Sequence, residues 1–495
     1  MRYLLIVFAG ICCLYGCRTV SKEQISSAKK PNVLFIAVDD MNDWVGFLDG
    51  YPNVKTPNFD KLASMGVSFS NAHTPSPLCG PSRASILSGK YPHKTGIYGN
   101  GQWWRPNYPD MVTIPMHFKN NGYHVAGAGK IFHHTAGFNP PDQWHEFRRM
   151  DYDDPWDRES RQNYPWTEVA QKPDWHPLHG LPFSHEFDWG VIPGKKEEDY
   201  GDSKTIKWCS EFLENYDDSK PFFLAAGLFH PHMPWYVPQK YLGMYPIDEI
   251  VLPEVLETDL DDIPEVGQKF AAAHRNHLNI IRKADKMKEA IQAYLASISY
   301  ADAQIGKLIN TLEESGKAKN TIIVLWSDHG WHLGEKDHFY KGTLWERSTR
   351  VPFVIATPDM KNAAKTCSSP VSLVSIFKTL NELCDLPELQ ELDGSSLVPL
   401  LADTKTKIPA LICYQKGNFA LQDERFHYIQ YHDGTEELYD HSTDKNEWYN
   451  IANSGNKDLL NKFRNHIPKD ISDDIPGKSD FEFDYQMYSW TRKSN

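Results

Sequence analysis

Strand and helix patterns alternate along most of this chain, and the first strand pattern is an uninterrupted apolar run at residues 33–38. An apolar run without polar alternation is typical of a strand that is buried on both faces of a sheet. Helical periodicity follows at residues 56–65, and Gly66 ends it. This alternation predicts an α/β fold with a large mixed, mainly parallel sheet that is flanked by helices. In such sheets the functional residues lie at the carboxyl ends of the strands.

The pattern changes after about Leu401, where short strand-like segments at 411–414, 418–421 and 426–431 are separated by turns. Short strands of this kind predict a small antiparallel-sheet subdomain. We therefore expect a large domain at residues 31–402 and a C-terminal subdomain at 403–495. Within the large domain we expect further strands at 124–128, 221–226, 321–326 and 351–356, and further helices at 114–121, 203–216, 287–315 and 370–383.

The N-terminus has the pattern of a secretion signal. Arg2 precedes an apolar stretch at residues 3–15 that is too short to span a membrane. Residues 14–17, Leu-Tyr-Gly-Cys, resemble the processing box of bacterial lipoproteins, in which Cys17 becomes the lipidated first residue. We expect a signal peptide at 1–17, a linker at 18–30, and a lipid-anchored protein in the periplasm or at the cell surface. Tyr15 is bulkier than is usual in this box, so secretion without the lipid stays an alternative.

Composition restricts the partners and the covalent chemistry. The net charge of −13 argues against a nucleic-acid partner. Of the 8 cysteines, Cys12, Cys13 and Cys17 belong to the expected signal peptide. Four others are too widely spaced for a zinc motif, and they allow a disulfide that the sequence does not assign. These four are Cys209, Cys367, Cys384 and Cys413.

The remaining cysteine, Cys79, opens a long motif. Residues 79–89 read CGPSRASILSG and match the pattern C-x-P-S-R-A-S-x-L-[TS]-G. The match resembles type I sulfatases of the alkaline-phosphatase superfamily. That resemblance implies an alkaline-phosphatase-like sandwich in which a maturating enzyme oxidises Cys79 to formylglycine, whose hydrated aldehyde attacks sulfur. The alternative is a small buried cysteine at the start of an ordinary helix, but the length of the motif favours the modification.

Carboxylates follow two of the expected strands. Asp39 and Asp40 come directly after the first strand, and Asp328 and His329 follow the strand at 321–326. Adjacent carboxylates repel each other unless a cation lies between them, and hard oxygen ligands suit calcium. Taken alone, the pair Asp39-Asp40 would predict a solvated turn. The resemblance instead implies a Ca²⁺ site formed by Asp39, Asp40, Asp328, His329 and Cys79.

His329 departs from the common sulfatase pattern, which has asparagine at this position. Imidazole is a poor ligand for calcium. The run D-H-G-W-x-L-G-E at residues 328–335 nevertheless resembles the iduronate-2-sulfatase branch of the family. The same branch has D-D-M-N-D-W, found here at 39–44, and G-K-x-F-H, found here at 129–133.

The resemblance also implies the residues that act on the substrate. Arg83 holds the diol, and Lys130 and Lys341 bind the sulfate oxygens as positive charges. His133 contacts the formylglycine and removes a proton. His232 protonates the leaving alcohol as the general acid, and His230 is the competing candidate for that role. Together the three cations supply the local positive charge that the acidic composition lacks.

Aromatic residues near this motif suggest a sugar substrate. Trp103, Trp104 and Arg105 lie in a loop after the motif, and we expect them, with His230 and His134, to bind substrate. Tryptophan faces stack on sugar rings, and arginine binds carboxylates or sulfates. Residues 138–200 contain five more tryptophans, for which a separate aromatic core is an equally good interpretation. They are Trp144, Trp156, Trp166, Trp175 and Trp189.

These observations predict a secreted, calcium-dependent sulfatase that acts on a sulfated poly- or oligosaccharide, such as a glycosaminoglycan, ulvan or carrageenan. Two alternatives stay open. Phosphonate monoester and phosphodiester hydrolases of the same superfamily also carry C-x-P-S-R. A non-catalytic carbohydrate-binding protein on a sulfatase scaffold is the other alternative, and the complete set of Cys79, Arg83, Lys130 and Lys341 weighs against it.

Overall fold

The computed structural model describes residues 30–150, 178, 181, 187–402, 405, 406 and 408–494. The expected signal peptide with Cys17 lies outside these residues, as do the linker up to residue 29 and Trp156, Trp166 and Trp175. The expectations for those segments therefore stay predictions. Within the described part of the chain, no helix combines the length and the apolar character that crossing a membrane requires.

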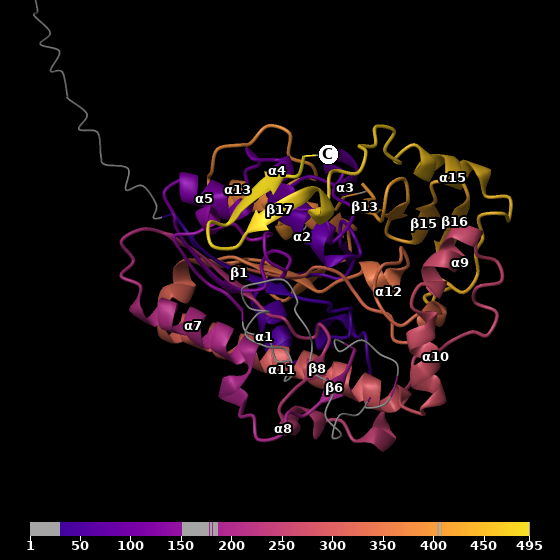
Figure 1. Cartoon of the computed structure of the whole chain (residues 1–495), viewed down its shortest axis with the longest axis horizontal. Helices are drawn as coiled ribbons and strands as arrows, with labels where there is room; N and C mark the ends of the chain where they lie inside the picture. Colours follow the sequence, from indigo (N-terminus) through magenta and orange to yellow (C-terminus); the bar gives the residue numbers. More distant parts are fainter. Residues whose placement is uncertain are drawn as a thin grey trace, which may run out of the picture.

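An eight-stranded mixed sheet forms the centre of the molecule, in the order β11-β2-β10-β9-β1-β7-β4-β5 (Figure 1). β1 pairs in parallel with β9 on one side and with β7 on the other. β10 runs antiparallel to its neighbours, which makes the sheet mixed but mainly parallel, as predicted. The strands are β1 (Asn32–Val38), β2 (Val67–Phe69), β4 (His124–Gly129), β5 (Glu146–Arg148), β7 (Phe222–Gly227), β9 (Thr321–Ser327), β10 (Phe353–Ala356) and β11 (Lys365–Cys367).

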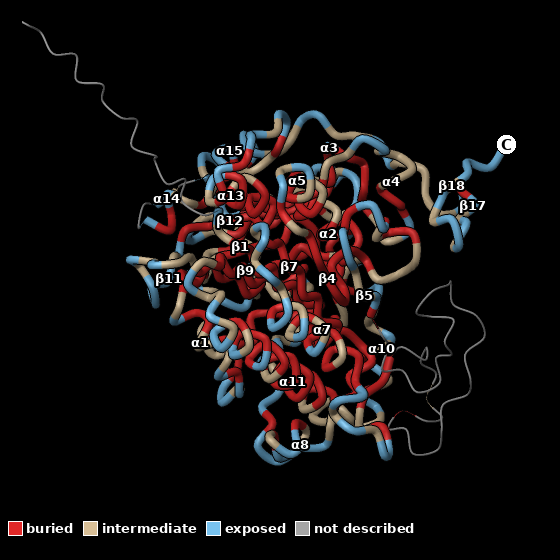
Figure 2. The backbone as a smooth tube through the Cα atoms, turned by 90° about the vertical axis from the view of Figure 1, so that its left-hand side faces the viewer, coloured by how far each residue is buried: buried red, intermediate tan, exposed pale blue. Residues whose placement is uncertain are grey.

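Helices cover both faces of this sheet, so β1 is buried along its whole length (Figure 2). Successive side chains of a strand point to opposite faces. Leu34 and Ile36 accordingly pack into one core with α11 (Met287–Glu314), whereas Val33 and Phe35 pack into another with α2 (Cys79–Ser88). The other main helices are α1 (Pro57–Met65) and α7 (Gly201–Asn215) on the first face, and α5 (Ile114–Asn120) and α13 (Ile376–Leu383) on the second.

One expected helix begins later than its sequence pattern predicts. The pattern at 370–383 predicts a continuous helix, but the segment starts with the short strand β12 (Val371–Ser372). This strand pairs in parallel with β3 (Ala72–His73), and α13 begins only at Ile376. Pairing with a distant segment therefore overrides the local helical periodicity, because the backbone groups of residues 371 and 372 are bonded elsewhere.

The C-terminal part forms the predicted antiparallel sheet, in the order β13-β14-β15-β16. Its strands are β13 (Ala410–Cys413), β14 (Phe419–Gln422), β15 (Phe426–Gln430) and β16 (Glu436–Asp440), and α15 (Lys457–Arg464) packs against them. Glu437 accepts hydrogen bonds from Trp345 Nε1 at 2.8 Å and Tyr439 Oη at 2.6 Å. This buried carboxylate thereby fastens the small sheet to the large domain.

After α15 the chain returns to the large domain. Residues 466–494, which we call the C-terminal segment, bond to it through the amides of Ser472, Ile475 and Lys478, which donate to the carbonyls of His93, Gly96 and Gly101. The segment ends in a hairpin, β17 (Phe481–Asp484) and β18 (Ser489–Arg492), that lies beside α4 (Trp104–Asn107) (Figure 1). The end of the chain thus contributes to the surface near α2.

Disulfides do not contribute to this architecture among the described residues. Cys79 is a free thiol there, and so are the four cysteines for which the sequence allowed a bridge. The four are Cys209, Cys367, Cys384 and Cys413.

A buried carboxylate and two histidines join the C-terminal sheet to the large domain. Glu447 Oε1 lies 3.0 Å from His441 Nε2 and also contacts His427 Nδ1, while its Oε2 accepts from the amide of Glu346 at 2.9 Å. Burial lowers the pKa of His441, but Glu346 and Glu447 outweigh it and raise that pKa to about 9. The protonated ring of His441 therefore holds two carboxylates together at neutral pH.

We predict that this proton makes the stability of the protein pH-dependent. Because the pKa of His441 rises from 6.5 to about 9 on folding, its stabilising contribution is complete below pH 6.5 and is lost as the pH rises through 9. Urea unfolding should therefore show about 1–3 kcal/mol less stability at high pH, and His441→Gln should remove most of this difference. His466→Gln, at an exposed histidine of the same subdomain, is the control. An equal pH dependence in all three proteins would contradict the prediction.

Candidate active site

The carboxyl ends of four neighbouring parallel strands meet at one edge of the sheet, and polar residues follow each of them. Asp39 and Asp40 follow β1, Asp328 follows β9, Lys130 follows β4, and His232 lies in the loop after β7. All five side chains are buried. The structure thus brings together residues that are up to 289 positions apart in the sequence, from Asp39 to Asp328.

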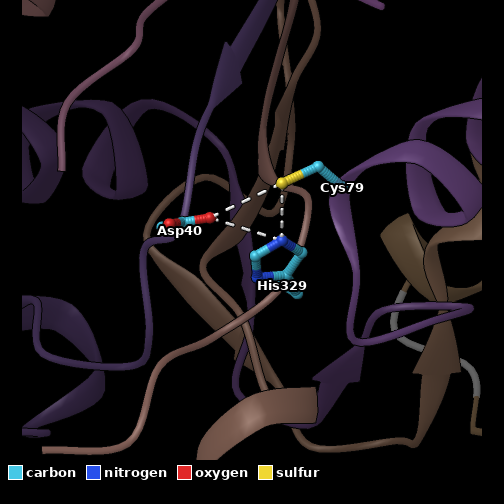
Figure 3. A group of neighbouring side chains, drawn as sticks. All are labelled: Asp40, Cys79 and His329. Atoms are coloured by element: carbon cyan, nitrogen blue, oxygen red, sulfur yellow. Dashed lines mark hydrogen bonds and ion pairs between the residues drawn. The ribbon is translucent and has the colours of Figure 1, made fainter. Parts of the chain in front are cut away.

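Cys79 stands at the first position of α2, and its side chain points toward Asp40 and His329 (Figure 3). Its Sγ lies 3.1 Å from Lys341 Nζ, 3.2 Å from His329 Nε2 and 3.8 Å from Asp40 Oδ1. Only 1% of the residue is exposed. Burial raises the pKa of the Cys79 thiol, although Lys130 and Lys341 act in the opposite direction. An unmodified thiol would therefore stay protonated and would be a poor nucleophile at neutral pH.

Arg83 lies one turn further along the same face of α2 and links two of the carboxylates. Its Nε donates to Asp328 Oδ2 at 2.8 Å, and a terminal nitrogen donates to Asp39 Oδ1 at 3.1 Å. The other terminal nitrogen donates to the carbonyls of Lys130 and Ile131. Arg83 is fully buried, so this planar fork fixes the relative positions of three strand ends.

The three carboxylates and three cations of the site form a balanced set. Besides the Arg83 bonds, Lys130 Nζ contacts Asp39, and Lys341 Nζ lies 2.6 Å from Asp40 Oδ1. Burial acts to raise the pKa of Asp328, but Arg83 outweighs it and holds that pKa well below its usual range. For Asp40 burial prevails over Lys341 and raises the pKa to about 8. The three positive and three negative charges therefore balance only when Asp40 has lost its proton, a form that a cation bound beside it would favour.

The donor atoms of this site fit a divalent cation. Asp40 Oδ2 is buried and has no hydrogen-bond partner among the described residues. His329 Nδ1 donates to the carbonyl of Gly330 at 3.0 Å, so its Nε2 presents a lone pair. That lone pair faces Asp40 Oδ1 at 3.3 Å and Asp328 Oδ2 at 3.7 Å. Three carboxylates and one imidazole nitrogen can therefore hold a cation, and the carboxylates are the hard ligands that calcium prefers.

The structure distinguishes the two histidines after β7. His230 is fully buried, and its ring nitrogens lie 2.7 Å from Asp202 Oδ2 and 2.9 Å from the carbonyl of Tyr236. Both nitrogens are thus bound to acceptors in the interior. His232 Nδ1 bonds to the carbonyl of Met233, while its Nε2 faces Asp40 Oδ2 at 3.8 Å. Only His232 therefore presents a ring nitrogen to the site.

His133 and His134 follow Lys130 and form one wall of an adjacent cavity of about 340 Å³. The two rings lie 4.5 Å apart, and His134 lies 5.6 Å from the ring of His232. Burial, assisted by Lys130, lowers the pKa of both His133 and His134 well below 6.5. His133 Nδ1 has no hydrogen-bond partner in the described part of the chain. A neutral His133 can therefore accept a proton.

The loop residues expected to stack on a sugar lie in the interior instead. Trp103 and Trp104 are 6% and 2% exposed, and their Nε1 atoms donate to the carbonyls of Ala136 and Phe138. Arg105 forms an ion pair with Asp142. This arrangement indicates that the three residues position the loop after His133, because neither indole presents a face to solvent. Substrate contact by them, by His134 or by His230 stays a prediction.

Two of the later tryptophans likewise pack inside the protein. Trp144 lies 4.8 Å from Phe147 and 6.4 Å from Phe132, measured between ring centroids. Trp189 stacks on Trp235 at 6.2 Å. Both are buried, so for these two residues the structure favours the aromatic-core alternative.

Sequence reasoning did not identify two features of the site. Lys478 of the C-terminal segment lies beside the loop after His133 and donates to Thr135 Oγ1 at 2.8 Å. Gly227 lets β4 and β7 approach closely, since a Cβ atom there would lie 2.3 Å from the carbonyl carbon of Lys130. Lys478 is remote in sequence from every motif, so no local signal could have identified it.

Comparisons with known proteins agree with this geometry. Residues 31–386 match the family model described as "Sulfatase", and residues 334–472 match "N-sulphoglucosamine sulphohydrolase, C-terminal". A "Sulfatase" of Formosa agariphila is 40% identical, over 92% of this chain and 89% of its own. The "Iduronate 2-sulfatase" of Homo sapiens is 30% identical, over 79% of this chain and 70% of its own.

Among solved structures, the phosphonate monoester hydrolase of Agrobacterium radiobacter is similar with a TM-score of 0.71 and 20% identity. The similarity covers 94% of this chain and 100% of that one. At this identity the likeness shows the fold alone.

We predict that Gly227→Ala destabilises the protein by about 1–3 kcal/mol, because the new methyl group must displace the backbone of Lys130. Urea unfolding measures this loss. Gly101→Ala is the control, since a Cβ atom at that position meets nothing within 4 Å and should change stability by less than about 0.5 kcal/mol. Equal stabilities of the two variants would refute the role of Gly227.

Proposed function

We infer that this chain, which belongs to the sulfatase family, hydrolyses the sulfate esters of a sulfated carbohydrate. The observation that carries this proposal is the position of Cys79 within its C-x-P-S-R motif, in contact with Lys341 and His329 at the carboxyl edge of the sheet. A relative that is named for iduronate, a sugar acid, supports a carbohydrate substrate.

We propose that Cys79 is converted to formylglycine, whose hydrated aldehyde supplies a hydroxyl group that attacks sulfur. Two observations support the modification. The thiol is buried with a raised pKa, so it would react poorly. Pro81 and Arg83 stand at the offsets that the maturating enzyme of this family reads. Because only 1% of Cys79 is exposed, that enzyme must act before the chain folds.

We further propose that Asp39, Asp40, Asp328 and His329 hold Ca²⁺, as the fit of the donor atoms supports. The bound ion supplies positive charge beside the sulfate and lowers the pKa of the attacking hydroxyl. With Asp40 ionised, as it would be beside a bound cation, the protein's own charges at this site cancel, because Arg83, Lys130 and Lys341 face three carboxylates. A divalent cation would therefore give the site the net positive charge that an anionic substrate needs.

The protein's side chains position the substrate and move the protons. Lys130 and Lys341 bind the sulfate oxygens and the charge that develops on them. His232 donates a proton through Nε2 to the leaving alcohol. Burial, assisted by Lys130, lowers the pKa of this ring well below 6.5, and the negative charge of the bound ester acts in the opposite direction by favouring the protonated form. His133 accepts the proton of the remaining hydroxyl, so that sulfate can leave and the aldehyde is restored. Its buried, neutral ring is suited to this role.

The location of the enzyme also remains a proposal. The N-terminal signal pattern and Cys17 support export and anchoring through a lipid on Cys17, in the periplasm or at the cell surface. Polymeric sulfated sugars are encountered outside the cytoplasm, so this location agrees with the proposed substrate.

The proposal predicts that Cys79→Ala lowers kcat for sulfate release by at least about 10³-fold while the protein still folds. Cys384→Ala, at another buried thiol remote from the site, is the matched control and should retain activity. Peptide mass spectrometry of the active enzyme should find an aldehyde at position 79. An unmodified thiol in fully active protein would refute the formylglycine proposal. Preferential hydrolysis of phosphonate monoesters or phosphodiesters in a paired screen would favour the alternative activity.

A further inference from the structure

Lys478 lies where the C-terminal segment crosses the edge of the active site. The backbone of the segment fixes its position, since the amide of Lys478 donates to the carbonyl of Gly101 at 2.6 Å. Its Nζ donates to Thr135 Oγ1 at 2.8 Å and lies 5.0 Å from the ring centroid of Phe138. Phe138 in turn packs against the ring of His133, with the centroids 4.8 Å apart. A short chain of contacts thus links Lys478 to a catalytic histidine.

The charge of Lys478 has no balancing carboxylate. Arg83, Lys130 and Lys341 each form ion pairs within the site. Lys478, in contrast, forms no ion pair with any carboxylate among the described residues, and burial alone lowers its pKa to about 8. Removing an ammonium group from water without an opposite charge is unfavourable. A threonine hydroxyl compensates only part of that cost, so the position favours an anionic ligand.

Lys478 also opens onto a groove that starts beside the nucleophile. This groove has a volume of about 860 Å³ and is lined by Leu78, the residue before Cys79, by Gly99 and by Tyr414. The groove is also lined by Asn418 and His432, which lie beside the C-terminal sheet, and by Lys478 of the C-terminal segment. The groove is large enough for sugar units beyond the one that carries the reacting sulfate. Lys478 is partly exposed and lines this groove, so a ligand in the groove can lie against its side chain.

We propose that Lys478 binds a second anionic group of the substrate, a carboxylate or a second sulfate, and so selects sugars that carry two negative charges. This inference rests on the proposed function, which supplies the first anionic group at the sulfate pocket. An ammonium group held at a fixed point recognises either kind of oxyanion as a point charge. The C-terminal segment would then be a specificity element, because it brings to the edge of the site a cation that forms no ion pair with the described residues, unlike Arg83, Lys130 and Lys341.

A structural role is the competing explanation. Lys478 Nζ lies over the rings of Phe138 and Trp103, at 5.0 and 5.8 Å, and such cation–π contacts could simply stabilise the segment. Loss of a structural contact would affect all substrates equally. Loss of an anion-binding contact would affect only substrates that carry the second anionic group.

The test compares sulfate release from three sugars that share one sulfated hydroxyl: the neutral sugar, the same sugar with a carboxylate, and the same sugar with a second sulfate. Lys478→Met retains the aliphatic stem over the rings but removes the charge. We expect it to lower kcat/KM about 10- to 100-fold for one or both doubly anionic sugars, and less than about 3-fold for the neutral one. The two doubly anionic sugars show whether the partner is a carboxylate or a sulfate. Lys478→Arg should restore part of the loss.

Lys493→Met is the matched control, because Lys493 lies in the same segment and is exposed, bonds to the backbone carbonyl of Ser479, and does not itself line the groove. Equal losses on all three sugars, or no loss on any, would overturn the proposal. If the native enzyme released no sulfate from any ester, the proposed function would fail separately. Calorimetric binding of the doubly anionic sugars to Cys79→Ala protein would still test Lys478, and an affinity that Lys478→Met leaves unchanged would refute its role.

Discussion

The structure depends on a set of six charges that are buried together at the carboxyl edge of the central sheet. Removing an isolated charge from water costs several kcal/mol, so each carboxylate must lie against a cation or a metal. Arg83 meets this requirement by bonding to Asp39 and Asp328 and to two backbone carbonyls after β4. The ends of β1, β9 and β4 are therefore held in one arrangement. That arrangement places Cys79, one turn before Arg83 on α2, beside Lys341 and His329.

Hydrogen bonds outside the site hold in position the segments that surround this edge of the sheet. Asp202 at the start of α7 fixes the loop after β7 by accepting from the amides of Phe229 and His230, which leaves His232 facing Asp40. The C-terminal sheet is fastened by Glu437 and Glu447, and the segment that follows it returns to line the groove beside Leu78. The reaction site therefore draws on the large domain, whereas the groove that would select the sugar draws on the C-terminal part as well. With this division, residues of the large domain carry out sulfate release, and the C-terminal part takes part in selecting the sugar.

The sequence was sufficient for the parts that local patterns encode. The apolar run before Asp39 predicted a buried central strand, and the alternation of strand and helix patterns predicted the mixed, mainly parallel sheet. Long-range packing decided the rest. Trp103 and Trp104 were expected to bind a sugar, and the structure buries both side chains and bonds their ring N–H groups to the carbonyls of Ala136 and Phe138. Asp202 binds the ring of His230, whereas His232 faces Asp40, and neither contact could be read from the sequence. The proposed role of Lys478 depends on a segment almost 400 residues from Cys79.

The central claim is that a divalent cation, bound with Asp40 in its ionised form, is needed to make this site bind sulfate, because the protein's own ionised groups there cancel. The most direct test is calorimetric titration of inorganic sulfate into metal-free and calcium-loaded protein. The account predicts that calcium tightens sulfate binding at least about 10-fold and, by reciprocity, that sulfate tightens calcium binding by the same factor. Asp40→Asn should remove most of this coupling. Equal sulfate affinity with and without calcium would contradict the account.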